Sequence, residues 1–215
     1  MGAGRRGLVC AALALCLSAV QAQASWTSEP AMQERLAAGE VVVTAPKEVD
    51  ASHPRGQVRA AVLIKADPEA VWRVMTDCAQ ALKFVPGLRK CRVLQAALDG
   101  TWADIEQEVR YSWLLPVVHY VFRAQYDRPH RIDFHRISGD LKEQQGTWLL
   151  TAEPAIGATL VEYELYVEPG FWIPHFLVTR SLRKDLPAVL AGLREHVQRA
   201  GTLVSGAPLP ASDAQ

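Results

Sequence analysis

Apolar and polar side chains alternate along most of the chain between residues 58 and 169. The stretches with this pattern are VRAAVLIKA, RVLQAAL, TWADIEQEVRYSWL, VVHYVFRAQY, RIDFHRI, GTWLLTAE and TLVEYELYVEP. Turn residues such as Asp99-Gly100, Pro129 and Gly139-Asp140 separate the later ones. Period-two alternation with turns between the runs predicts strands that pair consecutively and antiparallel. We therefore expect a meandering sheet with one covered face and one solvated face.

The alternation also assigns each side chain to a face. In the stretch at 101–114 the first face carries Ile105, Gln107, Val109, Tyr111 and Trp113, and the second carries Asp104, Glu106, Glu108 and Arg110. In the last stretch Val161, Tyr163, Leu165 and Val167 oppose Glu162 and Glu164. The apolar sets are predicted to face the core, and the close carboxylates are predicted to be solubilising charges.

A short helical pattern, EPAMQERLAAG, precedes the sheet, and two further segments within residues 58–200 have a helical pattern. The first follows the strand at 58–66, where Asp67 is a suitable N-cap, Pro68 suits the first helical position and Glu69 the first turn. The second begins after Pro174, and its apolar positions recur at helical spacing: Leu182, Leu186, Val189, Leu190, Leu193 and Val197. Pro187 should kink this long helix and Gly201 should end it. The helix is expected to cover the apolar face of the sheet.

The first 24 residues have the layout of a secretory signal peptide. Arg5 and Arg6 precede an apolar run from Gly7 to Val20, and the small residues Ala22 and Ala24 follow it. The run is shorter than the roughly 20 residues that span a bilayer. We expect cleavage after Ala24 and a periplasmic or secreted protein.

Residues 25–57 are predicted to form an N-terminal extension, because they are too short to bury a core of their own. The Ala/Pro/Ser/Gly-rich tail at 201–215 is predicted to be disordered. The remaining residues, 58–200, make one ordinary domain.

Charge and cysteine content restrict the function further. The 23 basic and 23 acidic side chains balance, and removal of Arg5 and Arg6 leaves a small acidic excess. This balance argues against nucleic-acid binding, which needs a basic surface. Cys10 and Cys16 would leave with the leader, so Cys78 and Cys91 remain either as a disulfide bond or as two buried thiols.

No catalytic or cofactor-binding motif is found in the sequence. The six histidines show no metal-ligand spacing, and neither a phosphate-binding glycine loop nor a Gly-x-Ser-x-Gly elbow occurs. We therefore predict no metal site and no cofactor, and a binding role is favoured over an enzymatic one.

The order of elements resembles a known superfamily. The stretches that carry the resemblance are IKADPEAVWRVMTD, FVPGLRKCRVL, GTWLLTAEP with TLVEYELYVEP, and the helix after Pro174. They resemble the START/Bet v 1-like (SRPBCC) superfamily, most closely its polyketide cyclase/dehydrase and coenzyme Q-binding branch. The resemblance implies an α+β helix-grip fold, in which a curved antiparallel sheet wraps around a long C-terminal helix. In this fold the connection between Cys78 and Cys91 doubles back, which favours the disulfide.

The resemblance also implies an apolar cavity between the sheet and the long helix. The residues expected to bind a ligand there are Gln107, Tyr111, Trp113, Tyr120, Phe122, Arg136, Trp148, Tyr163, Phe171, Trp172, Phe176, Leu186 and Leu190. Its polar members either contact a ligand headgroup or satisfy one another. Phe171, Trp172 and Phe176 form either one end of the cavity or part of a filled core.

Three functions follow from these alternatives. The first is a carrier for a lipid, an isoprenoid quinone or a polyketide-like molecule, with transient membrane contact. The second is a polyketide cyclase or aromatase, and the third is an interaction protein with a filled core. The sequence does not indicate an oligomeric state.

Overall fold

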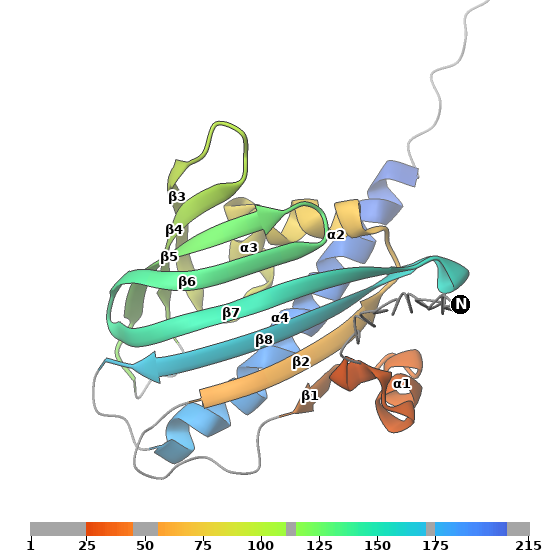
Figure 1. Cartoon of the computed structure of the whole chain (residues 1–215), viewed down its shortest axis with the longest axis horizontal. Coiled ribbons are helices and arrows are strands. Elements are labelled where there is room, and N and C mark those ends of the chain that lie inside the picture. The colour runs from red at the N-terminus through yellow and green to blue at the C-terminus, as the bar shows by residue number, and fades with distance from the viewer. Residues whose placement is uncertain (1–24, 45–55, 111–114, 171–174, 206–215) are drawn as a thin grey trace, which may run out of the picture.

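The computed structural model describes residues 25–44, 56–110, 115–170 and 175–205. Its centre is one curved eight-stranded sheet in which every neighbouring pair is antiparallel, in the order β1-β2-β8-β7-β6-β5-β4-β3 (Figure 1). The strands are β1 (Val42–Thr44), β2 (Gly56–Ile64), β3 (Leu88–Ala96), β4 (Trp102–Val109), β5 (Val118–Asp127), β6 (Arg131–Gly139), β7 (Leu141–Glu153) and β8 (Ala158–Pro169). Strands β3 to β8 form the predicted meander, and β2 closes it against β8. The predicted helix-grip arrangement is confirmed.

Two short helices connect β2 to β3. Helix α2 (Pro68–Met75) begins as predicted, because the Asp67 carboxylate accepts a hydrogen bond from the Ala70 amide at 2.8 Å and Pro68 occupies the first turn. Helix α3 (Cys78–Phe84) is capped in the same way, by Asp77 and the Ala79 amide at 2.7 Å. Both side chains satisfy amides that a helix start leaves unpaired.

Helix α4 (His175–Ser205) crosses the concave side of the sheet, behind the strands in Figure 1. Its buried residues are Leu186, Leu190, Leu193 and Val197, which are predicted apolar positions among the side chains described. Pro187 lies inside the helix, and the helix continues past Gly201 to Ser205. A single glycine lowers helix stability by only about 1 kcal/mol, so Gly201 does not end the helix.

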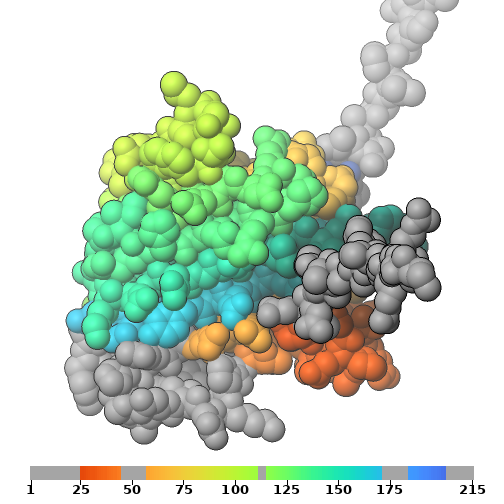
Figure 2. Space-filling view, in the orientation of Figure 1, coloured from red at the N-terminus to blue at the C-terminus, as the bar shows by residue number. Residues whose placement is uncertain are grey.

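The N-terminal segment covers part of the outer, convex side of the sheet. It consists of a 3-10 turn, η1 (Trp26–Ser28), helix α1 (Pro30–Ala37) and β1, which pairs with the edge of β2. Leu36 of α1 packs with Val42 and Ala61 in a buried cluster. Figure 2 shows this outer face, with the N-terminal segment in red next to β2 in orange. The sequence had predicted a solvated outer face, and the structure shows that part of this face is covered.

The carboxylates of this outer face are the clearest departure from the predicted solvated face. Glu162 is only 8% exposed and accepts hydrogen bonds from the hydroxyls of Ser25 and Thr27, the latter at 3.0 Å. Asp104 is also buried, and Arg123 holds it with two hydrogen bonds of 2.7 and 2.9 Å. That guanidinium holds the pKa of Asp104 below its usual range.

Glu106 is also buried, beneath the basic side chains of neighbouring strands. Its carboxylate lies 3.0 Å from the His119 ring, 3.0 Å from Arg92 and 3.3 Å from Lys90. The hydrogen bond from His119 and the two cations hold the pKa of Glu106 below its usual range. Long basic side chains therefore cover acids that the alternation pattern had assigned to solvent.

Replacing Glu162 by alanine should lower the free energy of unfolding by about 1–3 kcal/mol, because the buried Thr27 hydroxyl and the half-buried Ser25 hydroxyl lose their acceptor. Urea denaturation followed by circular dichroism measures the loss. Glu164→Ala is the matched control on the same strand and face, because the Glu164 side chain is 43% exposed and pairs with Arg59 at the surface. The control should change stability by less than about 0.5 kcal/mol. Equal losses for both variants would contradict the anchoring role of Glu162.

Candidate ligand-binding cavity

The concave face of the sheet does not close completely against the helices. A cavity of about 260 Å³ remains between strands β3 to β8, helix α3 and helix α4. Its wall is mainly aliphatic and aromatic, with apolar side chains that include Ile105, Val109, Phe122, Phe134, Leu165, Leu186, Val189 and Leu193. A concave space of this composition is typical of small-molecule sites.

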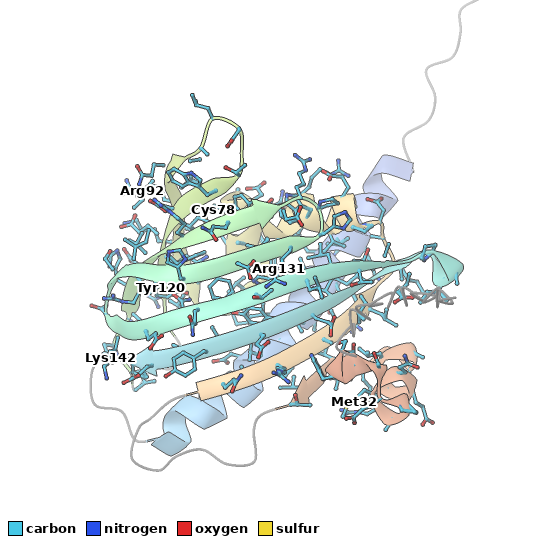
Figure 3. All side chains as sticks on the ribbon, in the orientation of Figure 1. Met32, Cys78, Arg92, Tyr120, Arg131 and Lys142 are labelled. Carbon is cyan, nitrogen blue, oxygen red and sulfur yellow. A yellow bond between two sulfur atoms is a disulfide. The ribbon has the colours of Figure 1, made fainter. Side chains whose placement is uncertain are left out.

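One end of the cavity lies where several strands begin or end. Val118 and Leu141 begin β5 and β7, Pro169 ends β8, and Val85 and Pro86 follow α3. In Figure 3, Tyr120 and Lys142 mark this end of the sheet, whereas Met32 of α1 lies at the far corner. Phe171 and Trp172, which were predicted to form one end of the cavity or part of a filled core, lie outside the described residues.

A row of aromatic rings forms the wall along β5 to β8. Trp148 and Tyr163 stack with ring centroids 3.8 Å apart, and Phe134 stacks on Tyr163 at 6.1 Å. Phe122 meets Phe134 edge-on at 6.0 Å. Gly146 makes this packing possible, since a Cβ atom there would lie 2.5 Å from Phe134 Cζ and 2.1 Å from the Glu164 carbonyl oxygen. The rings thus form one continuous, rigid surface.

The polar groups deepest under β4 and β5 satisfy one another. The Tyr120 hydroxyl donates to Gln107 Oε1 at 2.8 Å, and Gln107 Nε2 lies 3.8 Å from Cys91 Sγ. The Tyr126 ring packs edge-on against Trp72 at 5.7 Å, and burial raises the pKa of its hydroxyl. Gln107 and Tyr120 therefore hydrogen-bond to each other within the wall. Of the two alternatives for the polar residues, this favours mutual hydrogen bonding over contact with a ligand headgroup.

A disulfide bond ties the short helix to the sheet. Cys78 begins α3 and Cys91 lies in β3, and their Cα atoms are 5.2 Å apart. This is the pairing that the resemblance implied, and both cysteines line the cavity. The bond fixes α3 as part of the cavity wall.

Two polar side chains line the cavity that the sequence had not suggested. Gln144 lies on β7 and is 9% exposed, and its buried Oε1 atom has no hydrogen-bond partner among the described side chains and backbone. Asp185 lies on α4, one turn before Val189, and burial raises the pKa of its carboxyl. Neither was predicted, because β7 was expected to start at Gly146 and Asp185 is an acid beside an apolar stripe.

The raised pKa of Asp185 predicts how its replacement changes stability with pH. Because the folded-state pKa lies above the usual 3.8, the folded protein binds a proton more tightly than the unfolded chain. Stability from this group is therefore gained as pH falls through the folded-state pKa and is lost as pH rises. Asp185→Asn should be more stable than the wild type at pH 7, with the difference vanishing below about pH 3.8. Thermal unfolding between pH 3 and 8 measures the difference in stability between the variant and the wild type. A difference that does not change with pH would contradict a raised pKa for Asp185.

The structure divides the predicted site residues into three groups. Those that line the cavity are Gln107, Tyr120, Phe122, Trp148, Tyr163 and Leu186. Two lie elsewhere: Arg136 donates to the Gly139 carbonyl at 2.9 Å, and Leu190 is fully buried in the core beside Val62 and Val71. Those whose side chains lie outside the described parts of the chain are Tyr111, Trp113, Phe171, Trp172 and Phe176.

Other kinds of site find no support among the described residues. No group of three histidine, cysteine or acidic side chains is arranged to hold a metal ion within residues 25–44, 56–110, 115–170 and 175–205. In the same segments, none of the helices combines the length and the apolar character needed to cross a membrane.

Fold and cavity together define a helix-grip protein with an internal apolar cavity. Comparison with known families agrees: residues 64–194 match the family described as polyketide cyclase / dehydrase and lipid transport. The chain belongs to this family. A comparison with curated proteins finds no match.

Solved structures show the same fold at low sequence identity. A STAR-related lipid transfer protein from Xanthomonas axonopodis superposes with a TM-score of 0.61 at 17% identity, covering 73% of this chain and 98% of that one. The Zhui aromatase/cyclase from Streptomyces superposes with a TM-score of 0.60 at 14% identity, covering 71% of this chain and 99% of that one. A protein from Thermus thermophilus superposes with a TM-score of 0.58 at 24% identity, covering 67% of this chain and 98% of that one. These identities support the fold and not a particular activity.

Proposed function

We propose that the protein is an exported carrier that holds a hydrophobic ligand, without covalent change, between the sheet and α4. The cavity carries this proposal, because its wall is apolar apart from a few polar groups. The family description includes lipid transport, and the Xanthomonas structure is named a lipid transfer protein. The ligand classes that suit such a wall are a lipid, an isoprenoid quinone and a polyketide-like molecule.

Export is supported by two independent features. The leader pattern ends at Ala24, and the disulfide bond suits the oxidising environment outside the cytoplasm. Intact-mass measurement of exported protein should give a chain that starts at Ser25. Exported protein that retains residues 1–24 would contradict this part of the proposal. Ligand loading from a membrane belongs to the same proposal, and co-sedimentation with liposomes tests it.

A titration with a neutral environment-sensitive dye, such as Nile red, tests the carrier function directly. Fluorescence should rise and saturate at one dye per chain, and unlabelled apolar molecules should displace the dye. The heat capacity change on binding should be negative, since apolar surface is buried. Absence of saturable uptake by the folded, oxidised chain would contradict a carrier role.

A cyclase is the second candidate, and Asp185 is the observation that favours it. A carboxyl with a raised pKa inside a cavity is suited to general acid or base catalysis. The similar Streptomyces structure is named an aromatase/cyclase. Incubation with a linear poly-β-ketone thioester, followed by mass spectrometry, distinguishes the two functions. A carrier returns the thioester unchanged, whereas a cyclase yields a product that has lost water, at a rate that Asp185→Asn reduces.

A further inference from the structure

One polar atom of the cavity wall has no hydrogen-bond partner among the residues that the structure describes. Gln144 is more than nine-tenths buried, and its Oε1 atom accepts no hydrogen bond. Its register position, opposite Val167 and two residues from Gly146, places it on the cavity face of β7. A buried acceptor without a donor is costly and uncommon in native proteins. Its position on a cavity wall indicates a donor supplied by a ligand.

The charges around the cavity restrict what that ligand carries. Among the described lining residues Asp185 is the acid, and lysine, arginine and histidine are absent from that part of the wall. Arg136, opposite Phe122 in β5, is not among these lining residues: its Nη2 atom donates to the Gly139 carbonyl, and its buried Nε atom has no partner among the described residues. A carboxylate or phosphate against this described part of the wall would therefore lose its hydration without gaining a cation, near an acidic side chain.

We propose that the cavity selects compact apolar ligands with an uncharged hydroxyl group, an alcohol or a phenol, and that Gln144 Oε1 accepts its hydrogen bond. This inference rests on the carrier function proposed above. The hydroxyl supplies the missing donor and needs no counter-ion. The cavity volume of about 260 Å³ lies below the roughly 300–1,000 Å³ of sites for drug-sized ligands, which excludes bulky head groups.

Three probes, each built on a ten-carbon chain, test the selectivity. Decan-1-ol donates and accepts a hydrogen bond, decyl methyl ether only accepts, and decanoate is anionic at pH 7.5. Each is titrated against the oxidised protein saturated with the neutral dye, below its aggregation limit. Decan-1-ol should bind about tenfold more tightly than the ether, which corresponds to about 1.4 kcal/mol. Decanoate should bind at least about 100-fold more weakly than decan-1-ol.

Gln144→Leu isolates the acceptor. The affinity of this variant for decan-1-ol should fall about tenfold, to the affinity for the ether, whereas the affinity for the ether should not fall. The folded state should tolerate this variant, because the substitution removes a polar group that has an unsatisfied atom. Gln145→Leu is the matched control, since Gln145 is the exposed neighbour on the opposite face of β7. This control should leave the alcohol-to-ether ratio unchanged.

The outcomes separate the inference from the function on which it rests. Decanoate that binds as tightly as decan-1-ol, or a Gln144→Leu variant that affects alcohol and ether alike, overturns the inference and leaves the carrier function standing. Failure of the wild type to bind the dye and all three probes overturns the carrier function, and the inference with it. The wild-type comparison does not depend on the folding of any variant.

Discussion

Val189→Trp should abolish ligand uptake while the protein remains folded. Val189 lies on α4 and lines the cavity, so an indole at this position would occupy the space that a ligand needs. We expect the affinity for the neutral dye to fall by at least about 100-fold, because the ligand would have to displace packed side chains. Since the indole enters existing space, the cost to folding should stay within the roughly 1–3 kcal/mol of overpacking. Dye titration and thermal unfolding measure the two quantities.

Ala188→Trp is the control for this variant. Ala188 is the preceding residue of α4, and it is exposed. The same indole at this position should leave dye affinity within about twofold of the wild type, since the cavity is untouched. If both variants bind the dye as the wild type does, the cavity is not the binding site.

The double variant Cys78→Ser/Cys91→Ser should lose about 3 kcal/mol of unfolding free energy. The cysteines are 13 residues apart, and closing a loop of about 15 residues is worth roughly this amount through the unfolded chain. Both cysteines are replaced together so that neither is left as a free thiol. Urea denaturation should show an earlier midpoint, and ligand affinity should also fall because α3 is no longer tied to β3.

Reduction of the wild type supplies an independent comparison. Wild-type protein in excess dithiothreitol should unfold near the midpoint of the double variant, because both lack the same covalent link. The double variant should not respond to the reductant. A double variant as stable as the oxidised wild type would show that the bond contributes nothing to folding.

The sequence predicted the fold well where local pattern and tertiary structure agree. Period-two alternation located β4, β5, β6 and β8, and the Asp67-Pro68 pair located the start of α2. The start of β7 was missed, because Lys142, Glu143 and Gln144 lack an apolar alternation. These residues join the sheet through pairing with β8, such as Gln144 opposite Val167. Tertiary pairing outweighs local pattern there.

The outer face was predicted less well. Alternation assigned Asp104, Glu106 and Glu162 to the correct side of the sheet, but it contains no information on what covers that side. Here the N-terminal segment covers Glu162, and basic side chains from adjacent strands cover the other two. These contacts join residues distant in sequence, so no local pattern indicates them.

Part of the cavity could likewise be predicted from strand parity. Gln107 and Tyr163 were assigned inward, and both line the cavity. Arg136, which was also expected to bind the ligand, is not among the described lining residues, and it bonds to the Gly139 carbonyl near the register shift between Val121 and Phe122. Helical spacing identified Leu190 as buried but could not tell cavity wall from solid core. The unpartnered Gln144 is visible only when the contacts of its oxygen are known.

Native mass spectrometry of the protein isolated from its own compartment is the most direct measurement of the proposed carrier function. The spectrum should show the disulfide-bonded chain with one small molecule bound non-covalently, and organic extraction should release that molecule unchanged. Val189→Trp purified in parallel should carry none, whereas Ala188→Trp should carry it like the wild type. A wild-type chain that is recovered bare, and that stays bare after incubation with decan-1-ol, would contradict the carrier function.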